Sequence, residues 1–133
     1  MTKTNQIFNL TAPYANPYQG SRKRILFVCS VGLLRSPTAA AVGIQRGYNT
    51  RSCGSDTSCA LIPLSANLIE WAEVIVFVNS ENYLESLKEF ENTGYEEDIK
   101  AKKVVMNIPD NYEAFDLVLM RLIDAWFDEW EKT

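Results

Sequence analysis

The stretch that decides the fold lies near the start of the chain and reads Ile25-Leu-Phe-Val-Cys29-Ser-Val-Gly-Leu-Leu-Arg35-Ser36-Pro37-Thr-Ala-Ala-Ala41. Residues 25–28 form an apolar run rich in β formers, which predicts a short strand covered on both faces. Ser36 and Pro37 predict the start of a helix, with Ser36 as its N-cap and Pro37 in its first turn. The sequence thus indicates a strand, a tight loop and a helix, with Cys29 where the strand ends and Arg35 where the helix begins.

The loop between this strand and helix is expected to bind an anion, because backbone N–H groups and the positive end of a helix converge there. Arg35 adds a guanidinium fork suited to phosphate oxygens. Cys29 lies at the mouth of this cradle, where its thiol is expected to favour the nucleophilic thiolate. The expected phosphate-binding residues are Ser30, Val31, Gly32, Leu33, Leu34, Arg35 and Ser36. The alternative is an inert buried cysteine, but the arginine six positions on and the following Ser-Pro favour a phosphate loop.

The segment from Cys29 to Pro37 resembles the Cys-x5-Arg-Ser-Pro P-loop of the low-molecular-weight protein tyrosine phosphatases, and the resemblance extends over residues 23–131. It is closest to a short bacterial and phage branch of that family. The resemblance implies a hydrolase that acts through a cysteinyl-phosphate intermediate, with a phosphotyrosine protein or a small aryl phosphate as substrate. Cys29 is then the nucleophile, Arg35 holds the transferred phosphoryl group, and no metal or cofactor is needed.

A general acid must protonate the leaving oxygen and later activate water. The chain has no histidine, so this acid must be Asp or Glu. Asp110, in Ile108-Pro109-Asp110, is the candidate, although Pro-Asp-Asn is also a strong turn signal. Close relatives carry Asp where this chain has Asn107. If that first position is the family's acid, the acid has been lost.

Other functions remain as alternatives. A non-catalytic phosphate- or phosphopeptide-binding module would be favoured if the acid is lost. Arsenate reductase uses the same loop but needs resolving cysteines far downstream, and Cys53 and Cys59 fall in the wrong region. A phosphoryl carrier of the sugar-transport type needs no arginine clamp, so Arg35 argues against it.

The composition excludes several classes of function. The chain has 133 residues, a net charge of −4 and no long basic block, so we expect one domain that does not bind nucleic acid. No apolar stretch approaches the ~18 residues of a membrane span, and no apolar signal core is visible. Three cysteines are too few for a disulfide framework and a catalytic thiol needs a reducing compartment, so we expect a cytoplasmic protein without a zinc site.

The hydrophobic pattern predicts an extended arm over residues 1–22 and a single phosphatase-like domain over 23–133. Within the domain, apolar runs predict strands at 25–28, 74–78 and 104–106, and a further strand is expected at 48–53, ended by Gly54. Helical periodicity predicts helices at 37–46, 64–72, 81–91 and 113–131. Residues 92–103 are expected to form a charged connection. This β-α-β-α-β-α-β-α order predicts an α/β fold of three layers, in which helices cover both faces of a four-stranded parallel sheet. The loops after the first and fourth strands should then face each other.

The resemblance implies three further roles. Ser52 would buttress the phosphate loop by a hydrogen bond, although a local backbone bond is an equally good reading. Gly32 stands where the family often has Asn in a left-handed conformation, which glycine adopts without strain. Tyr112 would line the substrate ring, or simply pack.

Overall fold

The computed structural model of the protein describes residues 22–32, 35–109 and 112–133, so the predicted arm over residues 1–22 lies outside it apart from Arg22. Its elements are β1 (Arg24–Cys29), α2 (Arg35–Gln45), β2 (Asn49–Gly54), α3 (Ala66–Trp71), β3 (Val74–Phe77), α4 (Ser80–Glu89), α5 (Tyr95–Lys102), β4 (Lys103–Val105) and α6 (Leu117–Glu131). The predicted alternation of strands and helices is confirmed, with one additional helix, α5.

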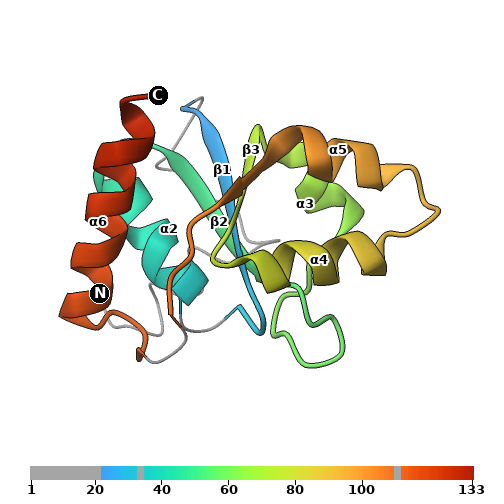
Figure 1. The fold of residues 1–133 in the computed structure, drawn as a ribbon, viewed down its shortest axis with the longest axis horizontal. Coiled ribbons are helices and arrows are strands. Elements are labelled where there is room, and N and C mark those ends of the chain that lie inside the picture. The colour runs from blue at the N-terminus through green and yellow to red at the C-terminus, as the bar shows by residue number, and fades with distance from the viewer. Residues whose placement is uncertain (1–21, 33–34, 110–111) are drawn as a thin grey trace.

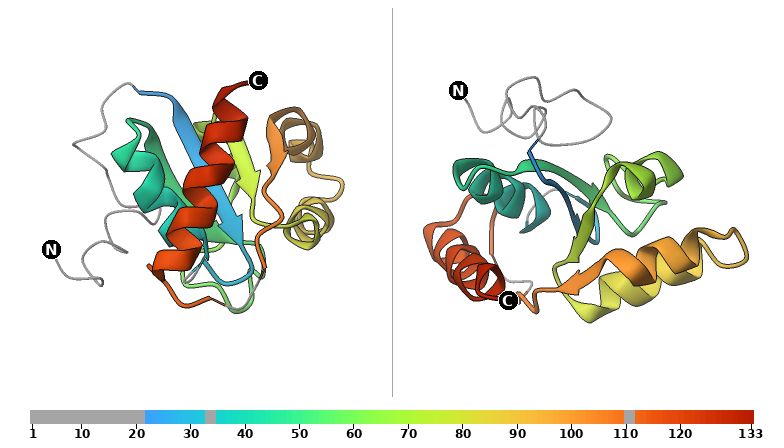
Figure 2. Two further views of the ribbon diagram at one scale, coloured as in Figure 1. Left: turned by 60° about the vertical axis from the view of Figure 1, so that its left-hand side comes forward. Right: turned by 90° about the horizontal axis from the view of Figure 1, so that it is seen from above.

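The four strands form one parallel sheet in the order β2-β1-β3-β4. Helices α2 and α6 cover one face of this sheet, and α3, α4 and α5 cover the other (Figures 1 and 2). The predicted three-layer α/β fold is therefore confirmed. The chain leaves β1 towards β2 and later returns to β3 on the other side of β1, so the carboxyl ends of β1 and β3 flank a topological switch point, where such folds bind ligands.

Strand β1 is buried on both faces, which explains its unbroken apolar sequence. Ile25, Phe27 and Cys29 belong to the core cluster shared with α2 and α6. Leu26 and Val28 belong to the cluster on the opposite face. The central strand is thus anchored in both halves of the core, and this fixes the position of the loop that follows it.

Helix α6 closes the first half of the core with a stripe of apolar side chains. Leu119, Ile123 and Phe127 are buried, and the rings of Phe127 and Phe27 meet edge to face with centroids 6.0 Å apart. Arg46, just after α2, binds three carboxylates of α6, those of Asp124, Asp128 and Glu131, at 2.7–2.9 Å. These contacts hold α2, and therefore the loop that precedes it, against α6.

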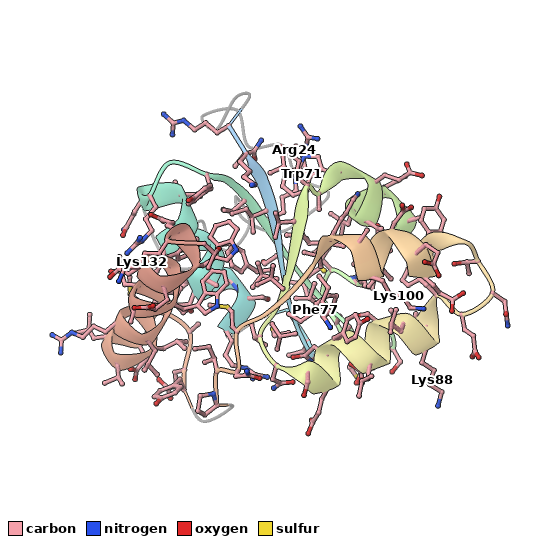
Figure 3. The ribbon with its side chains drawn as sticks, turned by 45° about the horizontal axis from the view of Figure 1, so that its top comes forward. Arg24, Trp71, Phe77, Lys88, Lys100 and Lys132 are labelled. Atoms are coloured by element: carbon pink, nitrogen blue, oxygen red, sulfur yellow. The ribbon has the colours of Figure 1, made fainter. Side chains whose placement is uncertain are left out.

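The other half of the core is organised around β3 and α4. Phe77 lies near the centre of the molecule, between the sheet and α4 (Figure 3), and its ring meets that of Tyr83 edge to face at 5.3 Å. At the far end of the sheet, the Nε group of Arg24 donates a hydrogen bond of 2.6 Å to the carbonyl of Trp71. Lys88 projects outward from α4 (Figure 3), and Lys100 of α5 forms an ion pair with Glu97 at 3.7 Å.

The expectation that residues 92–103 form an irregular connection is wrong, because Tyr95–Lys102 is the helix α5. The helix begins after Gly94, which has a left-handed backbone (φ 89°), and its first turn carries three acidic residues while its last turn carries two lysines. Acidic residues suit the amino end of a helix and basic residues the carboxyl end. The charges that suggested a loop therefore stabilise a helix that buries only Ile99.

Two predicted helix starts are also wrong. Helix α6 begins at Leu117 rather than at residue 113, because Phe115 has a left-handed backbone (φ 61°) and Asp116 is the N-cap. Helix α2 begins at Arg35, so Ser36 lies within its first turn and is not its N-cap. In the part of the chain that the structure describes, no helix is long and apolar enough to span a membrane.

Candidate active site

Cys29 is the last residue of β1, and its side chain is almost fully enclosed, with 2% exposure. The hydroxyl of Ser36 lies 3.0 Å from the Cys29 sulfur. The backbone N–H of Gly32 donates to the same sulfur at 3.2 Å. Both contacts suit a sulfur that carries negative charge, because each can supply a hydrogen to it.

The backbone of the Cys29 loop is fixed from outside by the segment that follows β2. The carbonyls of Cys29, Ser30 and Val31 accept hydrogen bonds from the N–H groups of Ser55 (2.8 Å), Asp56 (2.8 Å) and Leu61 (3.4 Å). In a trans peptide unit the C=O and N–H groups point in opposite directions. The N–H groups of residues 30–32 therefore turn away from this segment, and that of Gly32 turns towards the Cys29 sulfur.

Two glycines allow this close packing. Gly32 has a φ of +76°, and a Cβ atom on it would lie 3.0 Å from the backbone carbon of Cys53. A Cβ atom on Gly54 would lie 2.7 Å from the carbonyl oxygen of Ser30 and 2.5 Å from the Cβ of Ala60. The left-handed conformation expected at Gly32 is confirmed, and both positions leave no room for a side chain.

Arg35 is the first residue of α2, and only 3% of its surface is exposed. Its Nη1 group donates a hydrogen bond of 2.9 Å to the carbonyl of Ile108. The N–H of Ile108 in turn donates to the carbonyl of Val78 at 2.8 Å. The loops after β1 and β4 therefore meet, as the topology predicts, and the arginine joins them.

The structure describes only some of the other predicted site residues. Leu33, Leu34 and Asp110 lie outside the described residues. Asn107, which stands near Asp110 in the chain, is exposed and has a left-handed backbone (φ 61°).

The family resemblance also implies roles for Tyr112 and Ser52. Tyr112 is half-buried and packs against the core cluster of α2 and α6, so its expected contact with a substrate ring stays a prediction. The hydroxyl of Ser52 is buried and has no hydrogen-bond partner among the described residues, so the predicted buttress is not confirmed.

The sequence analysis missed a group of polar side chains beside the loop. Asn82, near the start of α4, donates from Nδ2 to the hydroxyls of Ser30 (3.1 Å) and Ser55 (3.2 Å). The hydroxyl of Ser55 also contacts a carboxylate oxygen of Glu85. Since parallel strands direct the segments after them to one edge of the sheet, the position of Asn82 just after β3 was the signal that could have revealed it.

The other two cysteines differ sharply in their surroundings. Cys53 is buried, and burial together with the nearby Cys29 raises the pKa of its thiol well above the ordinary value. Cys59 is exposed on the segment that follows β2. Within residues 22–32, 35–109 and 112–133, no group of three or more His, Cys, Asp or Glu side chains is placed to hold a metal ion.

Comparison with known structures identifies the fold as that of the low-molecular-weight protein tyrosine phosphatases. One similar structure is the YwlE arginine phosphatase from Geobacillus stearothermophilus, with a TM-score of 0.58 and 20% identity, over 83% of this chain and 94% of that one. Another is Vibrio vulnificus Wzb in complex with benzylphosphonate, with a TM-score of 0.60 and 17% identity, over 84% and 99% of the two chains. A third is the low molecular weight protein tyrosine phosphatase SP-PTP from Streptococcus pyogenes, with a TM-score of 0.61 and 17% identity, over 81% and 90%. No protein-family model matches the sequence, and no curated protein matches it.

Proposed function

We propose that this protein is a phosphomonoesterase of the protein tyrosine phosphatase type, which acts through a cysteinyl-phosphate intermediate. The observation that carries the proposal is the pairing of an enclosed thiol with an enclosed guanidinium across one short loop. The Cys29 sulfur accepts from Gly32 and contacts Ser36, and Arg35 is held by Ile108. The fold shared with phosphatases supports it.

In the proposed mechanism, the Cys29 thiolate attacks the phosphorus atom and the bond to the leaving oxygen breaks. The negative charge on the transferred phosphoryl group is stabilised by Arg35 and by the N–H groups of the loop, which are fixed before the substrate arrives. Ser36 stabilises the thiolate, because its hydroxyl oxygen lies 3.0 Å from the Cys29 sulfur and a sulfur that has lost its proton can only accept the hydroxyl hydrogen. Asp110 protonates the leaving oxygen and then takes a proton from the water that hydrolyses the thiophosphate bond.

The substrates that we propose are phosphotyrosine in proteins and small aryl phosphates. Two of the similar structures carry the names of phosphatases that differ in substrate, one for arginine and one for tyrosine, and a third holds benzylphosphonate. The aryl assignment rests on the resemblance of the Cys29 loop. A working thiolate requires a reducing compartment, so we also propose that the protein acts in the cytoplasm.

The test is hydrolysis of p-nitrophenyl phosphate by the wild type and by Cys29→Ser. We expect Cys29→Ser to lose turnover while it still binds inorganic phosphate, because the cradle of N–H groups and Arg35 remains. Cys59→Ser is the matched control, since it removes an exposed thiol outside the loop, and it should keep full turnover. Undiminished turnover in Cys29→Ser would remove this residue from the mechanism, and phosphate binding without turnover by the wild type would favour the non-catalytic module.

A further inference from the structure

We infer that Asn82 and Glu85 of α4 are positioning residues for the Cys29 loop, and that they act through the hydroxyls of Ser30 and Ser55. That Asn82 and Glu85 hold the loop in position follows from their contacts alone. That this position matters for catalysis rests on the proposed function. Asn82, Ser55 and Ser30 come from three separate segments that meet at the carboxyl edge of the sheet.

The first argument is burial. Asn82 has 2% exposure, and its Oδ1 atom is buried without a hydrogen-bond partner among the described residues. Burying a polar group is costly unless its hydrogen bonds compensate. The hydrogen bonds from its Nδ2 group to the hydroxyls of Ser30 and Ser55 therefore offset the cost of burying this side chain.

The second argument is that these contacts converge on the residue that carries the thiol. Ser55 donates its backbone N–H to the carbonyl of Cys29 at 2.8 Å, and its hydroxyl lies 3.4 Å from the same carbonyl. That hydroxyl is held from the other side by Asn82 and Glu85. A shift of Ser55 would therefore move the peptide unit that joins Cys29 to Ser30.

The third argument is that Asn82 is the described side chain that hydrogen-bonds the Ser30 hydroxyl. Gly32, two residues further along the loop, has no side chain that could bond to the adjacent strand β2. The hydroxyl of Ser52, which is buried in that strand, has no partner among the residues that the structure describes. The Asn82 contact with Ser30 therefore joins the loop to α4 through a side chain, in addition to the backbone bonds from the segment after β2.

The test compares Asn82→Leu, which keeps the volume of the side chain without its donor, with Asn79→Ala. The side chain of Asn79 caps α4 through the N–H groups of Glu81 and Asn82 and makes no hydrogen bond to the described loop residues 29–32, so this control weakens the same helix without the proposed effect. Two quantities are measured at pH 6.5: the affinity for vanadate by calorimetry, and the rate at which iodoacetamide alkylates Cys29. Both are measured in a Cys59→Ser background, with mass spectrometry to identify the modified residue.

We expect Asn82→Leu to weaken vanadate binding and to slow alkylation of Cys29 by about tenfold each, the effect of one lost hydrogen bond in an enclosed site. Ser30→Ala should add little to Asn82→Leu, because the two changes remove the same contact. Glu85→Ala should have an effect of the same sign that Glu89→Ala lacks, since Glu89 is exposed at the other end of the same helix.

The positioning role is overturned if Asn82→Leu behaves like the wild type, or if Asn79→Ala causes an equal loss at equal stability. The proposed function fails separately. A wild type that neither binds vanadate nor hydrolyses p-nitrophenyl phosphate would refute the phosphatase, while the alkylation rates would still decide whether Asn82 positions the loop.

Discussion

Arg35 and Ile108 are 73 residues apart in the chain and are joined by a hydrogen bond of 2.9 Å from the guanidinium to the backbone carbonyl. The bond occupies one N–H of the guanidinium, and it directs the plane of the group towards the loop after β4. Because the N–H of Ile108 is tied to β3, the position of the arginine is set by the sheet as well as by its own helix.

Arg35→Lys tests this arrangement. Lysine keeps the charge but loses the fork that can bond Ile108 and a phosphate at once. We expect turnover of p-nitrophenyl phosphate to fall by at least ~100-fold, as when a donor to a transition-state oxyanion is removed. The amide of Ile108 should exchange its hydrogen faster in the variant. Unchanged turnover and exchange would show that the fork is not needed.

Gly32→Ala tests the close approach of the loop to β2. The substitution should cost ~1–2 kcal/mol for the left-handed backbone and more for the contact with Cys53. Gly47→Ala is the matched control, because Gly47 also has a positive φ, of +95°, but a Cβ atom there would meet nothing within 4 Å. Denaturant unfolding should show a larger loss for Gly32→Ala, and only that variant should bind phosphate more weakly. Equal losses in the two variants would contradict the steric argument.

Arg46→Met tests the link between α2 and α6. The three carboxylates raise the pKa of Arg46, so the guanidinium stays charged at every pH at which the protein folds. The variant should lose ~1–2 kcal/mol of stability, because three partly exposed ion pairs share one cation, and 1 M salt should reduce the difference from the wild type. Arg121→Met, on the exposed side of the same helix, should have no such effect on the urea midpoint.

The buried Cys53 thiol should make stability depend on alkaline pH. Its pKa is raised in the folded protein by burial and by Cys29, whereas an unfolded cysteine titrates near ~8.5. Below that pH both states hold the proton and stability is unaffected. Above it the unfolded chain releases the proton first, so stability falls by up to ~1.4 kcal/mol per pH unit. The fall between pH 8.5 and 10 should be smaller in Cys53→Ala than in the wild type, and a fall of equal size in both would refute the assignment.

Charge at the rim of the site predicts a preference among substrates. Residues 30–32, 35, 55–65, 78–85, 106–109 and 112–116, which are the described segments just after the strands, carry five carboxylates and one cation, Arg35. The carboxylates belong to Asp56, Glu81, Glu85, Glu113 and Asp116. A phosphopeptide with flanking Lys or Arg should therefore show a lower KM than one with flanking Asp or Glu. Glu113→Lys and high salt should each reduce this difference, and no difference at low salt would contradict the prediction.

The sequence was sufficient to predict β1 and β3, because each is an apolar run of the length of a covered strand. The position of Cys29 at the end of β1 and of Arg35 at the start of α2 followed from the same pattern. Strand β2, Asn49–Gly54, is mostly polar in sequence, and it was predicted from its place between two expected helices. Ser36 was misread as an N-cap, because serine is a preferred N-cap residue and proline suits the first helical position. The helix begins at Arg35, two residues before the predicted start. Helix α5 was missed because it buries only Ile99 and therefore lacks an apolar period.

The contacts that complete the site could not be predicted from local sequence. Asn82 and Ser30 lie 52 positions apart. The position of Asn82 just after β3 places it near the carboxyl edge of the sheet, but nothing in the neighbouring sequence shows that its side chain bonds to Ser30. Gly54 is a second example. This position requires glycine because Ser30 and Ala60, which the fold brings next to it, leave no room for a side chain. Such residues are defined by neighbours that only the folded chain brings together.

The carbonyls of Cys29, Ser30 and Val31 accept hydrogen bonds from the segment that follows β2, and these bonds have a consequence for the kinetics of binding. These bonds are made within the protein, so they hold residues 29–31 in the same shape whether or not an anion is present. If the loop binds phosphate as proposed, this part of the site is preorganised. Phosphate should then bind without a conformational change of the loop. We expect its association rate to be set by diffusion and charge rather than by a slow rearrangement of the backbone.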